Sequence, residues 1–303
     1  MTDRILKKFG HKAKNVMVTC GYCLATCVSP VLNTQLRFIE ATGHRANLKC
    51  PQTFTEKISW LKLFLYSNDS LVKQCSDKLA VRDYVCVNGL GYLLNDLIAI
   101  YERPEDIPWE QLPKSFVLKW NFGCGYNLLC PDKDKISSDE AISTLKKWQR
   151  QQYWMLYSEL QYRVKKKYII CERFIKLPDQ TELLDYKFYC FEGVPKAVLV
   201  ISREDVQHKR AVFMTTDWQY LSDIPQRYSK SFIPDRPISL EKMVQAAAKL
   251  SKPFPFVRVD LYEWYGRPIF GEMTFTPGAG IYPSETLLNG KNMGDYIKLE
   301  DLR

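Results

Sequence analysis

Acidic residues near the C-terminus are spaced so that two of them could share a cation. The stretches 256–264 and 267–274 alternate apolar and polar side chains on either side of Gly266, which is the pattern of an antiparallel hairpin. If the hairpin is symmetric about Gly266, Asp260 lies opposite Glu272. Carboxylates that face each other across two strands destabilise the pairing unless their charge is offset. The pattern therefore suggests a divalent cation between them.

The same alternation predicts which side chains share a face of the hairpin. On the first strand, Arg258 and Asp260 are expected to point the same way. On the second strand, Phe270, Glu272 and Thr274 are expected together on one face. The polar face of the hairpin would then carry a guanidinium, two carboxylates and a hydroxyl.

Two lysines lie where a phosphate could be held. Lys119 ends a predicted strand just before a turn that contains Gly123 and Gly125, and glycines let backbone N–H groups approach phosphate oxygens closely. This turn is not a Walker A loop, because no Gly-Lys-Ser/Thr follows, and a plain hairpin is the alternative. Lys78 lies at a predicted helix start, where a lysine opposes the helix dipole unless an anion lies between them. A solvated lysine is the alternative there.

Three further stretches could contact a ligand. Glu172 ends an apolar strand, where its carboxylate could accept a hydrogen bond from an amine or hydroxyl. Lys187 shares a strand face with Asp185 and could reach a phosphate or an acidic substrate, or be a plain surface lysine. A basic cluster near a later strand could dock an anionic acceptor, or be a solvated loop. Its members are Arg203, His208 and Arg210.

The bulk composition limits the partners and the compartment. The 303 residues carry a net charge of +9, which favours anionic partners, and without a nucleic-acid-reading motif we expect no nucleic acid. The ten cysteines are scattered and several lie in apolar runs, which indicates buried thiols in a reducing, cytoplasmic setting. The apolar run 16–29 is too short and too polar to span a bilayer. We expect a buried first helix there, with peripheral contact at the inner face of the membrane as the alternative.

The order of predicted elements indicates an α+β (mixed α/β) fold with an antiparallel sheet late in the chain. Residues 15–70 are expected to form helices joined by a loop, with a stop at Gly43 and a cap at Thr55. Further helices are predicted across 76–86, 137–163 and 239–251. Strands are predicted across 97–101, 115–119, 168–175, 182–193 and 195–204, the last two forming a hairpin that turns at 192–193.

The chemical stretches occur in an order that resembles the ATP-grasp superfamily. The resemblance extends to the TupA-like ATP-grasp family of teichuronopeptide and polysaccharide biosynthesis, from about residue 46 onward. The motifs that carry it are NLKCPQTFTEKISWLKL, DKLAVRDYV, FVLKWNFGCGYN, LLDYKFYCFEG, FPFVRVD and FGEMTFTPGAG. The resemblance implies two α+β lobes that clamp ATP. We expect a helical N-terminal region over 1–75, a small lobe with the glycine turn over 76–171 and a large lobe with the metal site over 172–303.

The resemblance also implies a role for each candidate residue. The residues implied to bind ATP are Lys78, Lys119, Gly123, Gly125 and Glu172, with Glu172 beside the adenine. The residues implied to bind magnesium are Asp260, Glu272 and Thr274. The residues implied to be catalytic are Arg258 and Lys187. One position departs from the family, because its third metal ligand is usually Asn and this chain has Thr274.

The implied activity is that of an ATP-dependent carboxylate–amine ligase. ATP would convert a carboxylate to an acyl-phosphate, which an amine would attack to form an amide. The implied substrates are a uronic acid or another acidic sugar and an amino acid or amine, in capsular or cell-wall polysaccharide biosynthesis. The alternatives are a sugar kinase, a glycosyltransferase, or a non-catalytic nucleotide-binding scaffold.

Overall fold

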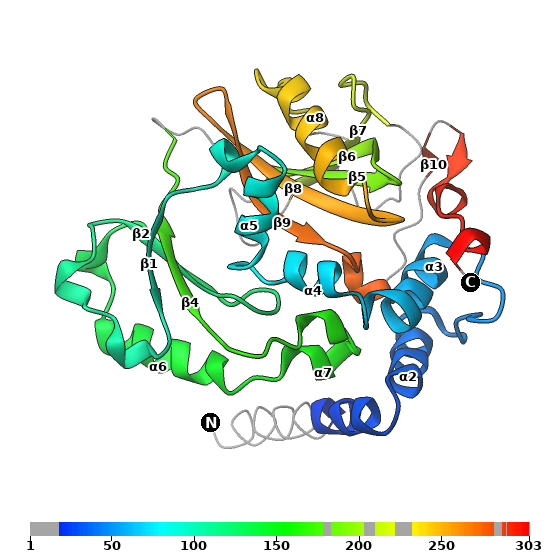
Figure 1. The fold of residues 1–303 in the computed structure, drawn as a ribbon, viewed down its shortest axis with the longest axis horizontal. Coiled ribbons are helices and arrows are strands. Elements are labelled where there is room, and N and C mark those ends of the chain that lie inside the picture. Colours follow the sequence, from blue (N-terminus) through cyan, green and yellow to red (C-terminus); the bar gives the residue numbers. More distant parts are fainter. Residues whose placement is uncertain are drawn as a thin grey trace, which may run out of the picture.

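The computed structural model describes residues 18–177, 183–202, 210–221, 232–281, 287–288 and 290–302. It has the expected α+β architecture, with two main antiparallel sheets that each form part of a separate hydrophobic core (Figure 1). The domain boundaries predicted after residues 75 and 171 stay predictions, and the second of them falls within a strand of the first sheet.

Helices come first along the chain, and groups of strands and helices follow from residue 97 onward. The α-helices are α2 (Pro30–Thr42), α3 (Phe54–Trp60), α4 (Ser70–Ser76), α5 (Val81–Val87), α6 (Ser138–Gln149), α7 (Tyr153–Tyr157) and α8 (Leu240–Ser251). The strands of the first sheet are β1 (Leu97–Tyr101), β2 (Phe116–Trp120), β3 (Asn127–Cys130) and β4 (Ile169–Arg173). Those of the second are β5 (Asp185–Phe191), β6 (Val194–Ser202), β7 (Arg210–Met214), β8 (Phe256–Trp264) and β9 (Arg267–Thr274). A small ribbon pairs β10 (Leu287–Leu288) with β11 (Lys291–Asn292).

The first sheet has the strand order β1-β4-β2-β3, and α6 packs against it. Its core is aromatic around Phe116 and Trp120, both fully buried. The Trp120 indole N–H donates to the carbonyl of Leu145 in α6 at 3.1 Å, so the helix is tied to the sheet by a buried hydrogen bond as well as by packing.

The second sheet has the order β7-β6-β5-β8-β9 and is covered on both faces. Helix α8 packs on β5, β6 and β8, where the Cys190 thiol meets the carbonyl of Ala247. On the opposite face, Phe54 at the start of α3 packs edge-on against Phe191 and also contacts Tyr189. Every residue of β5 is buried, including the charged Asp185 and Lys187, whose charges are offset by ion pairing.

The β8–β9 hairpin pairs Asp260 with Glu272 as predicted, but for a different reason. Its turn is the two residues Tyr265 and Gly266, so a regular ladder would have placed Gly271 opposite Asp260. A bulge next to Asp260 shifts the register by one residue and brings Glu272 opposite it.

The bulge also corrects the predicted faces of β9. Phe270 pairs with Leu261 and packs in the core with Met273, so it does not share the face of Glu272 as expected. Gly271 is needed at the bulge, because a Cβ there would lie 2.9 Å from both the Asp260 carbonyl oxygen and the Tyr262 ring.

Three local predictions differ from the structure. The cap of α3 is Thr53, which forms a capping box with Glu56, so the cap predicted at Thr55 is wrong. Lys78 lies in a turn ahead of α5, which begins at Val81. The long helix predicted over 137–163 is broken after α6, and α7 ends at Ser158, whose left-handed backbone has φ 55°.

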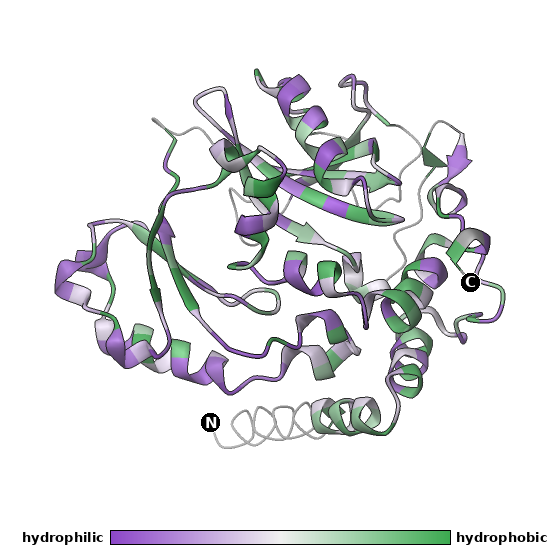
Figure 2. Cartoon of the chain, viewed as in Figure 1, coloured by the Kyte–Doolittle hydropathy of each residue, from purple (hydrophilic) through white to green (hydrophobic). Residues whose placement is uncertain are grey.

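Residues 18–28 are helical and mostly exposed, so the expected buried first helix is wrong. Their apolar side chains include Leu24 and Val28, which are 66% and 78% exposed. Figure 2 shows this helix coloured mostly as hydrophobic. Within the described part of the chain, every helix is too short or too polar to span a lipid bilayer.

Candidate active site

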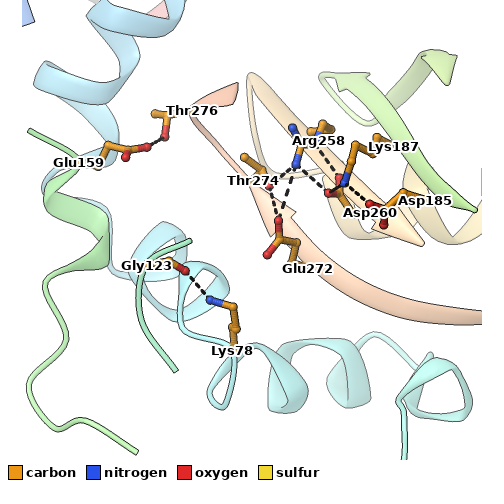
Figure 3. Close-up of polar contacts among 10 residues, drawn as sticks. All are labelled: Lys78, Gly123, Glu159, Asp185, Lys187, Arg258, Asp260, Glu272, Thr274 and Thr276. Atoms are coloured by element: carbon orange, nitrogen blue, oxygen red, sulfur yellow. Dashed lines mark hydrogen bonds and ion pairs between the residues drawn. The ribbon is translucent and has the colours of Figure 1, made fainter. Parts of the chain in front are cut away.

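Arg258 and Asp260 form the centre of a charged cluster on the open face of the β8–β9 hairpin (Figure 3). The guanidinium donates from Nε to Asp260 Oδ1 and from Nη2 to Oδ2, both at 2.7 Å. This bidentate pair is buried, with the Asp260 side chain only 2% exposed. Burial works against the charge of Arg258, but the carboxylate of Asp260 outweighs it and holds the pKa of Arg258 well above its ordinary value.

Lys187 brings a second cation to the same carboxylate. It stands on β5 directly beside Asp260, and its ammonium donates to Asp260 Oδ2. The ammonium also lies 3.5 Å from Asp185 Oδ2 on its own strand. The Lys187 side chain is only 7% exposed, so it is not a plain surface lysine. It shares the strand face of Asp185 as predicted, and its contact with a phosphate or an acidic substrate stays a prediction.

Glu272 and Thr274 complete the cluster on β9. The Thr274 hydroxyl accepts from Arg258 Nη2 at 2.9 Å and donates to Glu272 Oε1 at 3.3 Å. The Glu272 side chain is 38% exposed and is the most open part of the cluster. Burial alone would raise the pKa of Glu272, but the charges of Lys78, Lys187 and Arg258 hold it below its ordinary value.

Lys78 is positioned by a buried asparagine at the end of β2. The Lys78 backbone N–H donates to the carbonyl of Asn121 at 2.9 Å, and the Asn121 side chain donates to Asp77 Oδ2 at 2.7 Å. Asp77 in turn accepts from the N–H groups of Leu79 and Ala80. Burial lowers the pKa of Lys78, while the negative charge of Glu272 opposes that shift. The Asp-Lys turn is thereby fixed with its ammonium within electrostatic range of the hairpin.

The glycine turn between β2 and β3 contacts Lys78 and shares a pocket with the hairpin. The Lys78 ammonium donates to the carbonyl of Gly123, and both Gly123 and Gly125 have positive φ, at 66° and 81°. Cys124, between them, lines a pocket together with Glu272 and Arg258. The turn predicted to close over phosphates therefore lines the same pocket as the carboxylate hairpin.

Glu172 on β4 and Lys119 on the neighbouring strand β2 form an ion pair. Lys119 Nζ donates to Glu172 Oε2 at 2.7 Å, and Arg82 Nη1 donates to Oε1 at 3.1 Å. Arg82 also donates to the carbonyl of Asn95 at 2.9 Å. Both oxygens of Glu172 are thus occupied by cations, and its predicted place beside an adenine stays a prediction.

The pocket beside the hairpin has a volume of about 230 Å³. Its walls combine the hairpin residues Arg258, Glu272 and Thr274 with three tyrosines and a glutamate from the segment around α7 and with the turn Pro277–Gly280. One wall of the pocket therefore carries the charges of Arg258 and Glu272, and another wall consists of tyrosine rings.

The donors of the hairpin suit a magnesium ion in kind, because Asp260, Glu272 and Thr274 all offer hard oxygen. Across the described ranges no three His, Cys, Asp or Glu side chains gather into a metal-ligand group, so a third protein ligand would have to be the Thr274 hydroxyl. Both oxygens of Asp260 are held by Arg258 and Lys187. The residues fit the ion if it displaces Lys187 from Oδ2.

Of the predicted substrate-binding cluster, Arg203 and His208 lie outside the described residues. Arg210 begins β7, where its Nη2 donates to Ser202 Oγ at 3.2 Å and its guanidinium stacks over Phe232 at 4.8 Å. These contacts tie Arg210 to β6 and to the segment before α8. Its role with an acidic substrate stays a prediction.

Two features missed by sequence reasoning help to build the site. Asn121 lies in the glycine-turn motif, but nothing in the sequence indicates its hydrogen bond to Asp77, which is 44 residues away. Glu159 and the tyrosines around it fell inside the helix predicted over 137–163, which the structure breaks after α6. The only available signal was their density, since Tyr153, Tyr157 and Tyr162 occur within ten residues.

Two antiparallel sheets, with a glycine turn of one and a carboxylate hairpin of the other lining a shared pocket, define an ATP-grasp architecture. The chain belongs to the TupA-like ATP-grasp family, whose sequence model matches residues 56–298. No curated protein matches the chain at a significant level.

Similar solved structures include ATP-grasp ligases. The D-alanine–D-alanine ligase from Bacillus anthracis, solved with ATP, is 18% identical over 67% of this chain and 54% of its own, with a TM-score of 0.39. The L-amino acid ligase from Bacillus licheniformis is 15% identical over 69% and 45%, with a TM-score of 0.40. A RimK domain ATP-grasp protein from Sphaerobacter thermophilus is 10% identical over 75% and 69%, with a TM-score of 0.39. The chain spans about half the length of the first two.

Proposed function

We propose that the protein is an ATP-dependent carboxylate–amine ligase. The observation that supports this most is the paired carboxylates of Asp260 and Glu272, surrounded by Arg258, Lys187 and Lys78, in a chain of the TupA-like ATP-grasp family. A carboxylate is a poor electrophile, and its activation by phosphoryl transfer needs cations where negative charge gathers. Arg258 and Lys187 would supply those cations from neighbouring strands, and Lys78 from the turn ahead of α5.

The nucleotide would lie between the glycine turn and the hairpin. Lys78 and Lys119 would contact the phosphates, with the N–H groups around Gly123 and Gly125 facing the phosphate oxygens. Glu172 would lie near the adenine. Each of these positions is a proposal that rests on the family resemblance and on the placement of the residues around the junction of the sheets.

Magnesium would be held by Asp260, Glu272 and Thr274, and when bound it would neutralise charge on the phosphates. Lys187 would be released from Asp260 Oδ2 and become available to a phosphate or to the acidic substrate. Arg258 stays hydrogen-bonded to Asp260 Oδ1 and faces the pocket, where its guanidinium would stabilise charge on the transferred group.

The substrates that we propose are an acidic sugar, such as a uronic acid, and an amine or amino acid. The support is the resemblance to the family of polysaccharide biosynthesis, together with the net charge of +9, which favours an anionic substrate such as a capsular or cell-wall precursor. Neither observation selects a particular acid.

The activity can be tested by ADP release from MgATP in a matrix of uronic acids and amino acids. A ligase is expected to release ADP only when both the acid and the amine are present, and to form a hydroxamate when hydroxylamine replaces the amine. A kinase would release ADP with a sugar alone and form no hydroxamate, and a glycosyltransferase would release none. Tight MgATP binding by calorimetry without turnover would favour a scaffold. Glu272→Gln is the inactive control in every arm.

We also propose that residues 18–28 contact the cytoplasmic face of an anionic membrane. The exposed Leu24 and Val28 follow a basic stretch whose cations are Arg4, Lys7, Lys8, Lys12 and Lys14. Apolar side chains next to cations are typical of segments that lie in a membrane interface. Sedimentation with phosphatidylglycerol vesicles, but not with phosphatidylcholine vesicles, is the expected result. Sedimentation that Leu24→Glu leaves unchanged would contradict the proposal.

A further inference from the structure

The pocket beside the hairpin contains an acidic group that the roles proposed above do not use. Glu159 lines this pocket together with Tyr153, Tyr157 and Tyr162, and Glu272 lies on its other side. The aromatic residues come from the segment around α7, whereas Glu272 comes from β9. A ligand in this pocket would therefore lie between the aromatic segment and the proposed phosphoryl-transfer site.

Glu159 is almost completely buried, with an exposure of 2%, yet within the described part of the chain one of its oxygens accepts no hydrogen bond. Oε1 accepts from the Thr276 hydroxyl (Figure 3). That hydroxyl itself accepts from Gln161 Nε2 at 2.9 Å. Oε2 accepts no hydrogen bond from the described residues, although the nearby Tyr153 hydroxyl interacts with the carboxylate and opposes the rise in its pKa. A buried carboxylate oxygen without a donor is strongly unfavourable, so a ligand that donates to it gains more than the usual hydrogen-bond energy.

The nearby buried lysine does not supply that donor. The Lys62 ammonium donates to the carbonyl oxygens of Tyr157 at 2.9 Å and Ala279 at 2.8 Å, both of which belong to pocket residues. Lys62 therefore joins two walls of the pocket. Burial raises the pKa of Glu159 and lowers that of Lys62, and each group opposes the shift of the other by its charge.

We propose that this pocket binds the primary ammonium group of the amine substrate, with Glu159 Oε2 as its acceptor and the surrounding tyrosine rings as its walls. The proposal rests on the ligase function proposed above, for which it names the second substrate site.

An ammonium suits this pocket better than a neutral hydroxyl. A cation offsets the negative charge of Glu159 and Glu272, and it is attracted to the faces of tyrosine rings. The negative charge of Glu159, after burial, raises the pKa values of Tyr153 and Tyr162, so the field at their hydroxyls is one that favours a positive ligand. The pocket also opens beside Arg258, where the activated carboxylate would lie.

The first experiment compares matched ligands on the wild-type protein in the presence of MgADP. Calorimetry is used with glucosamine and glucose, L-alanine and L-lactate, and ethanolamine and ethylene glycol. We expect at least one amine to bind, and its hydroxyl counterpart to bind at least ten-fold more weakly, because a charge-assisted hydrogen bond is lost. Equal affinity within every pair, or no binding by any amine, would overturn the proposal. This comparison does not depend on the stability of any variant.

The second experiment uses Glu159→Gln, which keeps an oxygen for Thr276 and removes the charge. We expect amine affinity to fall at least ten-fold, and a retained thermal transition with MgADP binding to show that the fold is intact. The matched control is Glu110→Gln, because Glu110 is exposed on the surface. Amine affinity that is unchanged in a folded Glu159→Gln variant would overturn the proposal.

The two proposals fail in different ways. If amines bind as expected but no acid and amine release ADP together, the ligase function is wrong and the ammonium site stands. If ADP release needs both substrates but hydroxyl counterparts bind as well as amines, the ligase function stands and the ammonium site is wrong.

Discussion

Replacing Lys187 by Met tests whether Asp260 is a metal ligand whose Oδ2 is occupied by the Lys187 ammonium until a metal ion displaces it. The change removes one of the two cations on a carboxylate that is only 2% exposed, and keeps a side chain of similar length in the buried position. Oδ2 of Asp260 would keep only its bond from Arg258 Nη2. Lys147→Met, at an exposed position on α6, is the matched control.

The expected loss of stability is large for a single substitution. Removing one partner of a buried ion pair costs about 3–5 kcal/mol. Asp260 keeps a bidentate pair with Arg258, with both bonds at 2.7 Å, so the lower end of about 3 kcal/mol is expected. For a chain of 303 residues that loss lowers the melting temperature by roughly 5 °C. Lys147→Met is expected to change stability by less than about 0.5 kcal/mol.

Magnesium should then reverse most of the loss. In the variant, Asp260 Oδ2 no longer pairs with Lys187, so a metal can bind without displacing a cation. At about 100 times its dissociation constant, an ion that binds only the folded state adds about 2.7 kcal/mol. Thermal unfolding of wild type and variant, with magnesium or with the same ionic strength of sodium, measures this. The reasoning is refuted if Lys187→Met melts with the wild type, or if magnesium stabilises the variant no more than it stabilises the wild type.

Three further changes test the surroundings of the site. Glu56→Gln should lower stability by about 2 kcal/mol at pH 7. Burial raises the pKa of Glu56, but hydrogen bonds from three backbone N–H groups outweigh burial and lower that pKa below 4.5. The stability difference from wild type should therefore vanish as pH falls through the folded pKa, and a difference in unfolding midpoints that stays constant with pH would contradict this. Gly271→Ala places a Cβ 2.9 Å from the Asp260 carbonyl oxygen and should destabilise the fold by about 1–3 kcal/mol in denaturant titrations; a neutral effect would show that the bulge is dispensable. Gly123→Ala, which places a Cβ 2.7 Å from the Tyr153 ring, should weaken MgADP binding in calorimetry more than Gly125→Ala, whose Cβ would have no described atom within 4 Å. Equal effects would leave only backbone strain as the cause, because both glycines have positive φ.

The pairing of Asp260 with Glu272 was predictable because it depends on short-range alternation around a turn. The reason given for it was incomplete, since the two-residue turn at Tyr265 and Gly266 requires a bulge to bring these acids opposite each other. A glycine inside a strand is a signal of such a bulge, and Gly271 carried it. The family and the α+β fold could likewise be predicted from ordered motifs, and the family match confirms the family.

The pocket was harder to foresee because nothing in the sequence marks the break between α6 and α7. The segment 150–152 has neither glycine nor proline, and the left-handed residue that ends α7 is Ser158. The break is stabilised by distant contacts, such as the Asn33 side chain, which donates to the carbonyls of Met155 and Leu156 at 3.3 Å. Long-range hydrogen bonds of this kind leave no periodic pattern.

The exposed first helix could not be predicted for a related reason. Its apolar residues favour burial by composition, but its position at the edge of the fold leaves Leu24 and Val28 uncovered. Burial depends on which other segments pack against a helix, and a single sequence does not reveal them.

A crystal structure with magnesium and a non-hydrolysable ATP analogue tests the central proposal most directly. It is expected to show a metal ion bound by Asp260 and Glu272, with the triphosphate between the hairpin and the glycine turn and within reach of the Lys78 ammonium. A triphosphate bound elsewhere, with Arg258 and Lys187 still enclosing Asp260 and no ion beside Glu272, would contradict it.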